Sequence, residues 1–176
     1  GADPIIKSSE PIYVPLVQPE SHFDKEKLED AFRQGAKALI LCNPSNPCGK
    51  VFTMEEMQTI AELAKKYDAY VVTDEVYEHI CFAPQGHASV LAHRALRERA
   101  IAVSSFGKTF HMTGWKVGYC VAPAPISAEI RKVHQYLTFS VNTPAQLALA
   151  DMLRAEPEHY LALPDFYRQK RDILVN

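Results

Sequence analysis

Residues 38–46, ALILCNPSN, join a continuous apolar run to a polar loop that opens with Asn43-Pro44. A short apolar run that ends in a turn of this kind predicts a strand that is buried on both faces. Two further runs have the same form: 69–73 (AYVVT), which leads into Asp74-Glu75, and 101–106 (IAVSSF), which leads towards Lys108. The three runs together predict a sheet in which most strands are parallel.

Helical patterns lie between these runs. Asp24 precedes a segment with apolar residues at helical spacing, and Thr53 with Glu56 forms the capping-box pattern that starts a helix. Strand and helix therefore alternate, which predicts an α/β fold with a mostly parallel sheet and helices on both faces. We expect further strands at 11–16 and 115–121, and further helices at about 90–99, 126–137 and from Pro144 onward, with Pro157 and Pro164 as interruptions.

Composition and charge exclude several classes of function. The 176 residues carry a net charge of -2, which gives no electrostatic reason to expect nucleic acid or an anionic membrane as partner. No apolar run approaches the roughly 18 residues of a membrane span, and the first residues do not resemble a signal peptide, so we expect a cytoplasmic protein. The four cysteines and seven histidines lack the spacing of known zinc sites, so we expect no metal site.

Polar residues follow each of the three predicted strands. They occupy 43–46, 74–77 and 105–108. In sheets of this kind ligands bind outside the carboxyl ends of the strands, so these segments should converge at one edge. Each residue alone also has an ordinary structural explanation: a helix cap for Asp74, a solvated surface position for Lys108, a ring packed at the edge for Tyr77, and turns at the two Asn-Pro pairs.

The segment 104–119, SSFGKTFHMTGWKVGY, allows two interpretations of Lys108. A phosphate-binding loop needs a glycine five residues before Gly107, and Ala102 occupies that position inside an apolar run, so we reject a nucleotide site. A Schiff-base site for pyridoxal phosphate needs a lysine amine for the aldehyde and a carboxylate for the pyridine nitrogen, together with donors to the phenolic oxygen and a cation for the phosphate. The ends of the three strands, with Lys116 just beyond, supply all four.

Three motifs, NPSNPCGKVF (43–52), TDEVYEHI (73–80) and 104–119, together resemble the class I/II aminotransferases, which are fold-type I pyridoxal phosphate enzymes. The segment SVNTPAQ (140–146) strengthens the likeness to the subgroup that acts on methionine, aromatic amino acids and kynurenine. The resemblance implies that Lys108 forms a Schiff base with pyridoxal 5'-phosphate and that Asp74 pairs with the protonated pyridine nitrogen.

The resemblance also implies roles for four other residues. Asn46 and Tyr77 would hydrogen-bond the phenolic oxygen of the cofactor, while Ser105 and Lys116 would bind its phosphate. Much of the wider family has arginine where Lys116 stands, and the kynurenine-type subgroup commonly has lysine. Lys108 would remove the α proton of the amino acid and return it to the cofactor, first as general base and then as general acid.

The implied function is transamination between an amino acid and a 2-oxo acid, in a homodimer. Chains of this family are longer, so we expect 1–176 to form part of the cofactor-binding large domain, without the N-terminal segment or the C-terminal small domain. Alone it should bind the cofactor weakly and transaminate poorly. Two alternatives stay open: a pyridoxal phosphate-dependent carbon–sulfur lyase of the same fold, and a truncated domain without activity.

Overall fold

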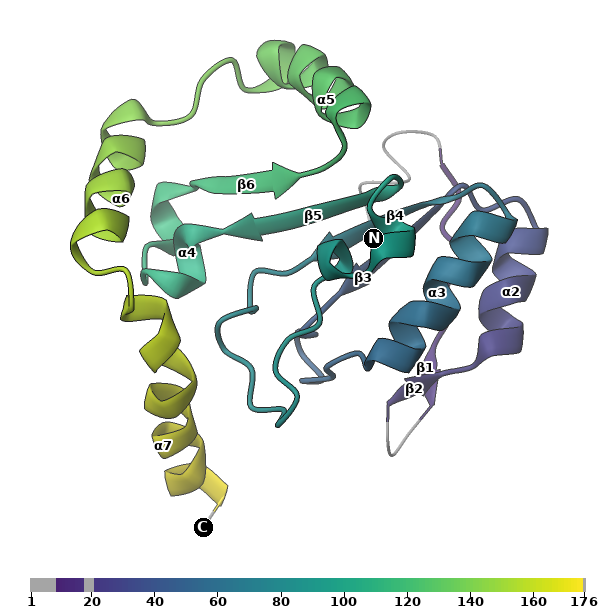
Figure 1. Cartoon of the computed structure of the whole chain (residues 1–176), viewed down its shortest axis with the longest axis horizontal. Helices are drawn as coiled ribbons and strands as arrows, with labels where there is room; N and C mark the ends of the chain where they lie inside the picture. Colours follow the sequence, from purple (N-terminus) through teal and green to yellow (C-terminus); the bar gives the residue numbers. More distant parts are fainter. Residues whose placement is uncertain (1–8, 18–20, 176) are drawn as a thin grey trace.

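A computed structural model describes residues 9–17 and 21–175, which form a sheet flanked by helices and continued by a helical arm (Figure 1). The strands are β1 (Leu16–Val17), β2 (His22–Phe23), β3 (Ala38–Cys42), β4 (Tyr70–Asp74), β5 (Ala100–Ser105) and β6 (Gly118–Val121). The α-helices are α2 (Lys25–Arg33), α3 (Met54–Lys66), α4 (Phe106–Thr109), α5 (Ala124–Leu137), α6 (Thr143–Ala155) and α7 (Leu163–Val175). Short 3-10 turns lie at η1 (Val90–Ala92), η2 (Arg94–Leu96), η3 (Thr113–Trp115) and η4 (His159–Ala162).

The main sheet has the strand order β3-β4-β5-β6, and its first three strands are parallel. This confirms the predicted α/β fold with a mostly parallel sheet. β6 runs antiparallel to β5, and the connection between them holds only the short turns α4 and η3, not the longer helix that is typical of a parallel crossover. The predicted strand 115–121 is correspondingly shorter, since η3 occupies its start.

The apolar core lies between one face of the sheet and the helices α2 and α3. Leu28, Phe32, Met57 and Ile60 from these helices pack against alternate residues of the strands, which include Val71, Ala100 and Ala102. On the opposite face of the described sheet Ile40 is 67% exposed and Val103 is also exposed. The described residues therefore show the helical cover most fully on one face.

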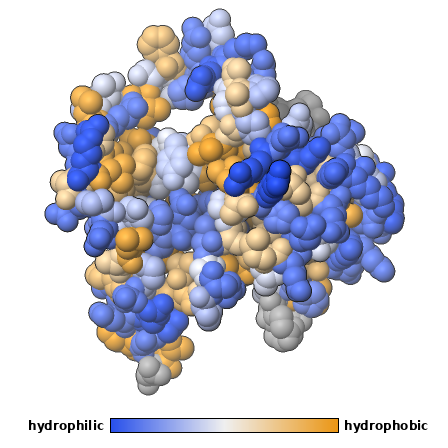
Figure 2. Space-filling model, in the orientation of Figure 1, coloured by the Kyte–Doolittle hydropathy of each residue, from blue (hydrophilic) through white to orange (hydrophobic). Residues whose placement is uncertain are grey.

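The helices α5, α6 and α7 form an arm beyond β6 (Figure 1). No described side chain of α5 is buried, and apolar side chains reach the surface along the arm, among them Val133, Leu137 and Leu147 (Figure 2). Helix α6 packs against the segment that precedes β6, because Ala145 and Leu149 form a small buried apolar cluster with Val117. Among the described residues no helix has the length and apolar character that a bilayer crossing requires.

The start of α3 confirms the predicted capping box. The Glu56 backbone N–H donates to Thr53 Oγ1 at 3.1 Å, and the Thr53 backbone N–H donates to Glu56 Oε2 at 2.9 Å. Lys50 Nζ also lies 2.8 Å from Glu56 Oε1. The loop 43–52 is therefore tied to the first turn of α3, which positions it at the end of β3.

Three further predictions about the elements were wrong in extent or type. Pro11 and Pro15 lack a backbone N–H for a ladder, and the strand is limited to β1, which pairs antiparallel with β2. The predicted helix 90–99 is instead η1 and η2, because His93 between them has extended backbone angles. Pro164 lies in the first turn of α7, where proline is tolerated, and does not interrupt it.

Two methionines of α3 provide a test of the core. Met57 is 1% exposed and Met54 is 54% exposed. We expect Met57→Ala to lower the free energy of unfolding by about 2–5 kcal/mol, because the change leaves a cavity in a packed core. The same substitution at Met54 should change it by less than about 0.5 kcal/mol. Urea denaturation measures both, and equal losses at the two positions would contradict the assignment of the core.

Candidate functional site

The loops that follow β3, β4 and β5 meet at one edge of the sheet. Asn46 Nδ2 donates a hydrogen bond to the Tyr77 hydroxyl at 3.2 Å, although 31 positions separate the two residues. Lys108 Nζ lies 5.9 Å from the centroid of the Tyr77 ring, within the range of a cation–π contact. The amide and the amine thus both lie close to the Tyr77 side chain, although the three groups come from segments that follow three different strands.

Lys108 stands on α4, a single turn that begins where β5 ends. The Ser105 side chain caps this turn by accepting the Gly107 backbone N–H at 3.4 Å. Gly107 also allows a close approach: a Cβ there would lie 3.1 Å from the Cα of Thr113. The Thr113 hydroxyl donates to the Gly107 carbonyl at 3.0 Å. Both backbone groups of Gly107, the residue before Lys108, are therefore hydrogen-bonded. This restricts the positions that the Lys108 amine can reach.

A cavity of about 470 Å³ opens beside Lys108 and is lined by Ser105, Lys116 and His134, among others. Lys116 adopts left-handed backbone angles directly after η3, and this bend places it on the wall of the same cavity as Lys108. Two amines, a hydroxyl and an imidazole suit an anionic group such as a phosphate. The sequence did not indicate His134, because it comes from α5, 26 positions after Lys108, and belongs to no motif.

Asp74 is the last residue of β4, and the ladder pairs it with Val103. Because paired residues point to the same face, Asp74 shares the face of Val103, which lines the cavity beside Lys108. Its Oδ1 accepts the Val76 backbone N–H at 3.1 Å, so this oxygen stabilises the turn that follows. Tyr77 thus contacts both Asn46 and Lys108. Asp74 is linked to Lys108 only by its position on the face of the sheet that carries Val103.

Asn43 has a structural role at the start of the first loop. It is 0% exposed, and its side chain accepts the Phe52 backbone N–H and donates to the Ala88 carbonyl, each at 3.0 Å. An amide that satisfies two distant backbone groups in the interior fixes the loop more firmly than a turn alone. Asn46, three residues further on, is thereby held near Tyr77.

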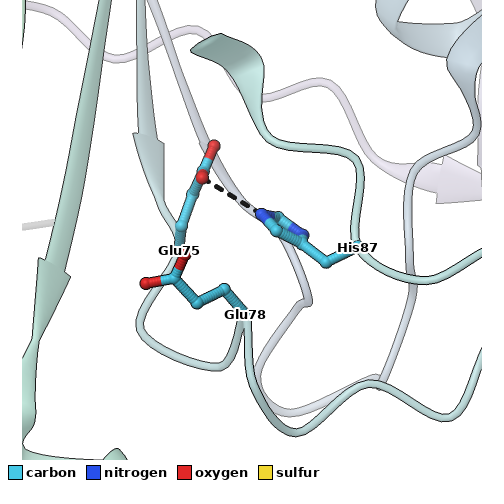
Figure 3. Close-up of side chains that lie close together, drawn as sticks. All are labelled: Glu75, Glu78 and His87. Carbon is cyan, nitrogen blue, oxygen red and sulfur yellow. Dashed lines mark hydrogen bonds and ion pairs between the residues drawn. The ribbon is translucent and has the colours of Figure 1, made fainter. Parts of the chain in front are cut away.

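Glu75 was not indicated by the sequence, and it is 2% exposed. Its carboxylate accepts the Thr73 hydroxyl at 2.9 Å and the Val90 backbone N–H at 2.8 Å, and His87 Nε2 lies 3.0 Å from it (Figure 3). Burial by itself raises the pKa of this carboxyl, but the hydrogen bonds from His87, Val90 and Ser89 outweigh burial and hold the pKa below its usual value. An ionised Glu75 therefore anchors the end of β4.

Glu75, Glu78 and His87 have potential ligand atoms within 4.8 Å of one another (Figure 3), a spacing that a metal ion could bridge. Protein donors already occupy the two carboxylates: Glu78 Oε1 accepts the hydroxyls of Ser104 and Tyr119 at 2.9 and 3.0 Å. Hydrogen bonding thus accounts for both acids, and we assign the cluster as a structural network.

Fold and sequence both match known aminotransferases. The chain matches the class I and II aminotransferase family over residues 5–176. It is 66% identical over 161 residues to the methionine aminotransferase of Escherichia coli, covering 92% of this chain and 42% of that protein. It is 42% identical to the kynurenine–oxoglutarate transaminase of Dictyostelium discoideum, covering 87% of this chain and 36% of that protein.

Solved structures give the same result. A crystal structure from Escherichia coli described as having a methionine aminotransferase function superposes with a TM-score of 0.89 at 66% identity, over 92% of this chain and 42% of that one. N-Succinyldiaminopimelate aminotransferase from Mycobacterium tuberculosis superposes with a TM-score of 0.90 at 36% identity, over 97% and 45%. The chain belongs to the class I and II aminotransferase family, and it spans less than half the length of these relatives.

Enzymes of this family depend on pyridoxal phosphate, and the residues at the edge of the sheet have the chemistry to hold it. Lys108 offers an amine for the aldehyde and Asp74 a carboxylate for the ring nitrogen. The hydrogen-bonded pair Asn46–Tyr77 offers donors for the phenolic oxygen, and the cationic cavity suits the phosphate. The donor set therefore fits the cofactor.

The ionised state of Glu75 predicts a dependence of stability on pH. Since folding lowers its pKa, its charge contributes stability above the pKa of an unfolded glutamate, about 4.3, and the contribution is lost as the pH falls towards the folded value. Glu75→Gln should therefore be less stable than the parent near neutral pH, and the difference should shrink in acid. Urea denaturation at several pH values measures it.

Glu62→Gln is a matched control, because Glu62 is exposed on α3. Its effect on the free energy of unfolding should be small at every pH. A Glu75→Gln difference that stays constant across the acid range would contradict an ionised Glu75.

Proposed function

We propose that this chain carries the cofactor-binding part of a pyridoxal phosphate-dependent aminotransferase, which transfers an amino group from an amino acid to a 2-oxo acid. The observation that supports this most directly is that Tyr77 contacts both Lys108 and Asn46, although the three residues follow separate strands. Relatives named methionine aminotransferase and kynurenine–oxoglutarate transaminase favour donors of the methionine, aromatic or kynurenine type.

The catalytic roles follow from the chemistry of Lys108 and Asp74. Pyridoxal phosphate, when bound, draws electrons from the α-carbon of an attached amino acid and makes its proton acidic. The Lys108 amine would attach the cofactor and, once displaced by substrate, move the α proton as general base and then as general acid. The Asp74 carboxylate would keep a proton on the ring nitrogen, because a nearby anion favours the protonated form.

The remaining residues would fix and orient the cofactor. Tyr77 and Asn46 would donate to the phenolic oxygen, which sets the tilt of the ring. Ser105 and Lys116 would hold the phosphate in the cavity that they line with Lys108. Lysine offers a point charge in place of the planar fork of arginine, so Lys116 would neutralise the phosphate with less control of its orientation.

We propose that residues 1–176 form part of the large domain of a longer protein, as the 42% coverage of a close relative supports. The exposed apolar side chains on α5 and α6, such as Val133 and Leu147, support contact with a second copy in a homodimer. Free thiols at all four cysteines are compatible with a cytoplasmic location.

Solvent exchange of the α proton of methionine tests the function. Chain incubated with pyridoxal phosphate in D₂O should replace the α proton with deuterium and form the corresponding 2-oxo acid in an amount no greater than the bound cofactor. Proton NMR measures both. Lys108→Ala should reduce exchange to the rate of free cofactor, because the amine that moves the proton is gone. Lys132→Ala, on the exposed face of α5, is the control and should behave like the parent.

Two results would contradict the proposal. Exchange that is equally fast in the parent and in Lys108→Ala would assign the proton transfer to another group. Release of methanethiol and ammonia together with 2-oxobutyrate, in place of the sulfur-containing 2-oxo acid of methionine, would indicate elimination rather than amino transfer.

A further inference from the structure

The turn that follows β4 has two sides with different surroundings. Asp74 and Tyr77, three residues apart, belong to the site at the edge of the sheet. Glu75 and Glu78, also three residues apart, accept hydrogen bonds from side chains of the strands instead. Thr73 donates to Glu75, and Ser104 and Tyr119 donate to Glu78. The same short turn therefore presents one pair of side chains to the site and uses the other pair as anchors.

Glu78 connects this turn to two neighbouring strands. Its Oε1 accepts the Ser104 hydroxyl of β5 at 2.9 Å and the Tyr119 hydroxyl of β6 at 3.0 Å. Burial, together with the negative charge of Glu78, raises the pKa of Tyr119, so its phenol stays protonated as a donor. Two hydroxyl donors on one charged oxygen form a stronger link than a single neutral hydrogen bond.

The two partners of Glu78 lie next to residues of the segment that carries Lys108. Ser104 precedes Ser105, which caps the turn that carries the lysine. The ring of Tyr119 packs 5.3 Å from the ring of Phe106, the first residue of α4. Glu78 thus lies between two segments: its own backbone continues that of Tyr77, and its hydrogen bonds hold residues that pack against the base of Lys108.

We propose that Glu78 is a positioning residue that sets the separation between the Tyr77 hydroxyl and the Lys108 amine. The inference rests on the proposed function, since that separation matters only if both groups contact one cofactor. Glu78 is not among the residues that line the cavity beside Lys108, although its partners Ser104 and Tyr119 are. It therefore acts through these two residues and through Tyr77, its neighbour in the chain. Three other titratable groups lie close to Glu78. His79 Nε2 lies 3.9 Å from Glu78 Oε1, and burial lowers the pKa of this imidazole. Glu75 and His87 have ligand atoms within 4.8 Å of a carboxylate oxygen of Glu78.

Hydrogen exchange of the chain without cofactor tests the anchoring. The amides of Glu75, Glu78 and Ile80 form backbone hydrogen bonds to the carbonyls of Val103, Glu75 and Tyr77. Glu78→Ala should speed their exchange by roughly tenfold or more, because the turn loses a charged acceptor. Exchange within α3 should stay unchanged. Glu78→Gln keeps an acceptor oxygen for the two hydroxyls and should largely restore protection.

The visible absorption of bound pyridoxal phosphate tests the effect on the site. A donor to the phenolic oxygen favours its anionic form, so loss of a well-placed Tyr77 hydroxyl should raise the pH midpoint of the absorption change by about one unit. Glu78→Ala and Tyr77→Phe should shift the midpoint in the same direction, and Glu78→Gln should shift it less. Glu62→Ala, which removes an exposed carboxylate from α3, should leave both the exchange and the midpoint unchanged.

The two measurements separate the possible failures. Faster exchange without a shift of the midpoint would show that Glu78 supports the fold alone, and would overturn the proposal. Unchanged exchange in Glu78→Ala would overturn the anchoring itself. Failure of the parent chain to bind pyridoxal phosphate would contradict the proposed function instead, and the exchange of the chain without cofactor would still decide whether Glu78 holds the turn.

Discussion

The parallel register of β3, β4 and β5 is the constraint on which the site depends. Hydrogen bonding aligns Cys42 with Asp74, and Asp74 with Val103, so the three strands end at nearly the same level. The loops that follow must then leave the sheet side by side, whatever their separation in sequence. A slip of one residue would turn Asp74 to the other face and separate it from the cavity beside Lys108.

Buried polar groups, more than apolar packing, fix these loops once they leave the sheet. Asn43 holds the first loop, Glu75 the second, and the Ser105 cap with Gly107 the third. A buried amide or carboxylate is costly unless its hydrogen bonds are satisfied, so such a residue tolerates few alternative arrangements of its partners. The loops at the edge of the sheet are therefore rigid, as a binding site requires. The apolar core between the sheet, α2 and α3 supplies most of the stability.

The sequence predicted the elements whose causes are local. Apolar runs located β3, β4 and β5 to within a residue or two, and Thr53 with Glu56 located the start of α3. The segment 90–99 was mispredicted as a helix because His93 adopts extended backbone angles and divides it into the short turns η1 and η2. Convergence of Asn46, Tyr77 and Lys108 could be predicted because it follows from topology. The role of Glu78 could not, because its partners Ser104 and Tyr119 lie 26 and 41 positions away, and the motifs that contain them do not indicate this contact.

The central claim is that separate strand ends place one particular lysine where pyridoxal phosphate can react with it. Borohydride reduction of the chain after incubation with the cofactor, followed by peptide mapping of the labelled lysine, measures this most directly. The account predicts that the label lies on Lys108 and that Tyr77→Ala or Asp74→Ala weakens labelling there without moving it elsewhere. Label spread over exposed lysines such as Lys132 and Lys66, with no excess at Lys108, would contradict it.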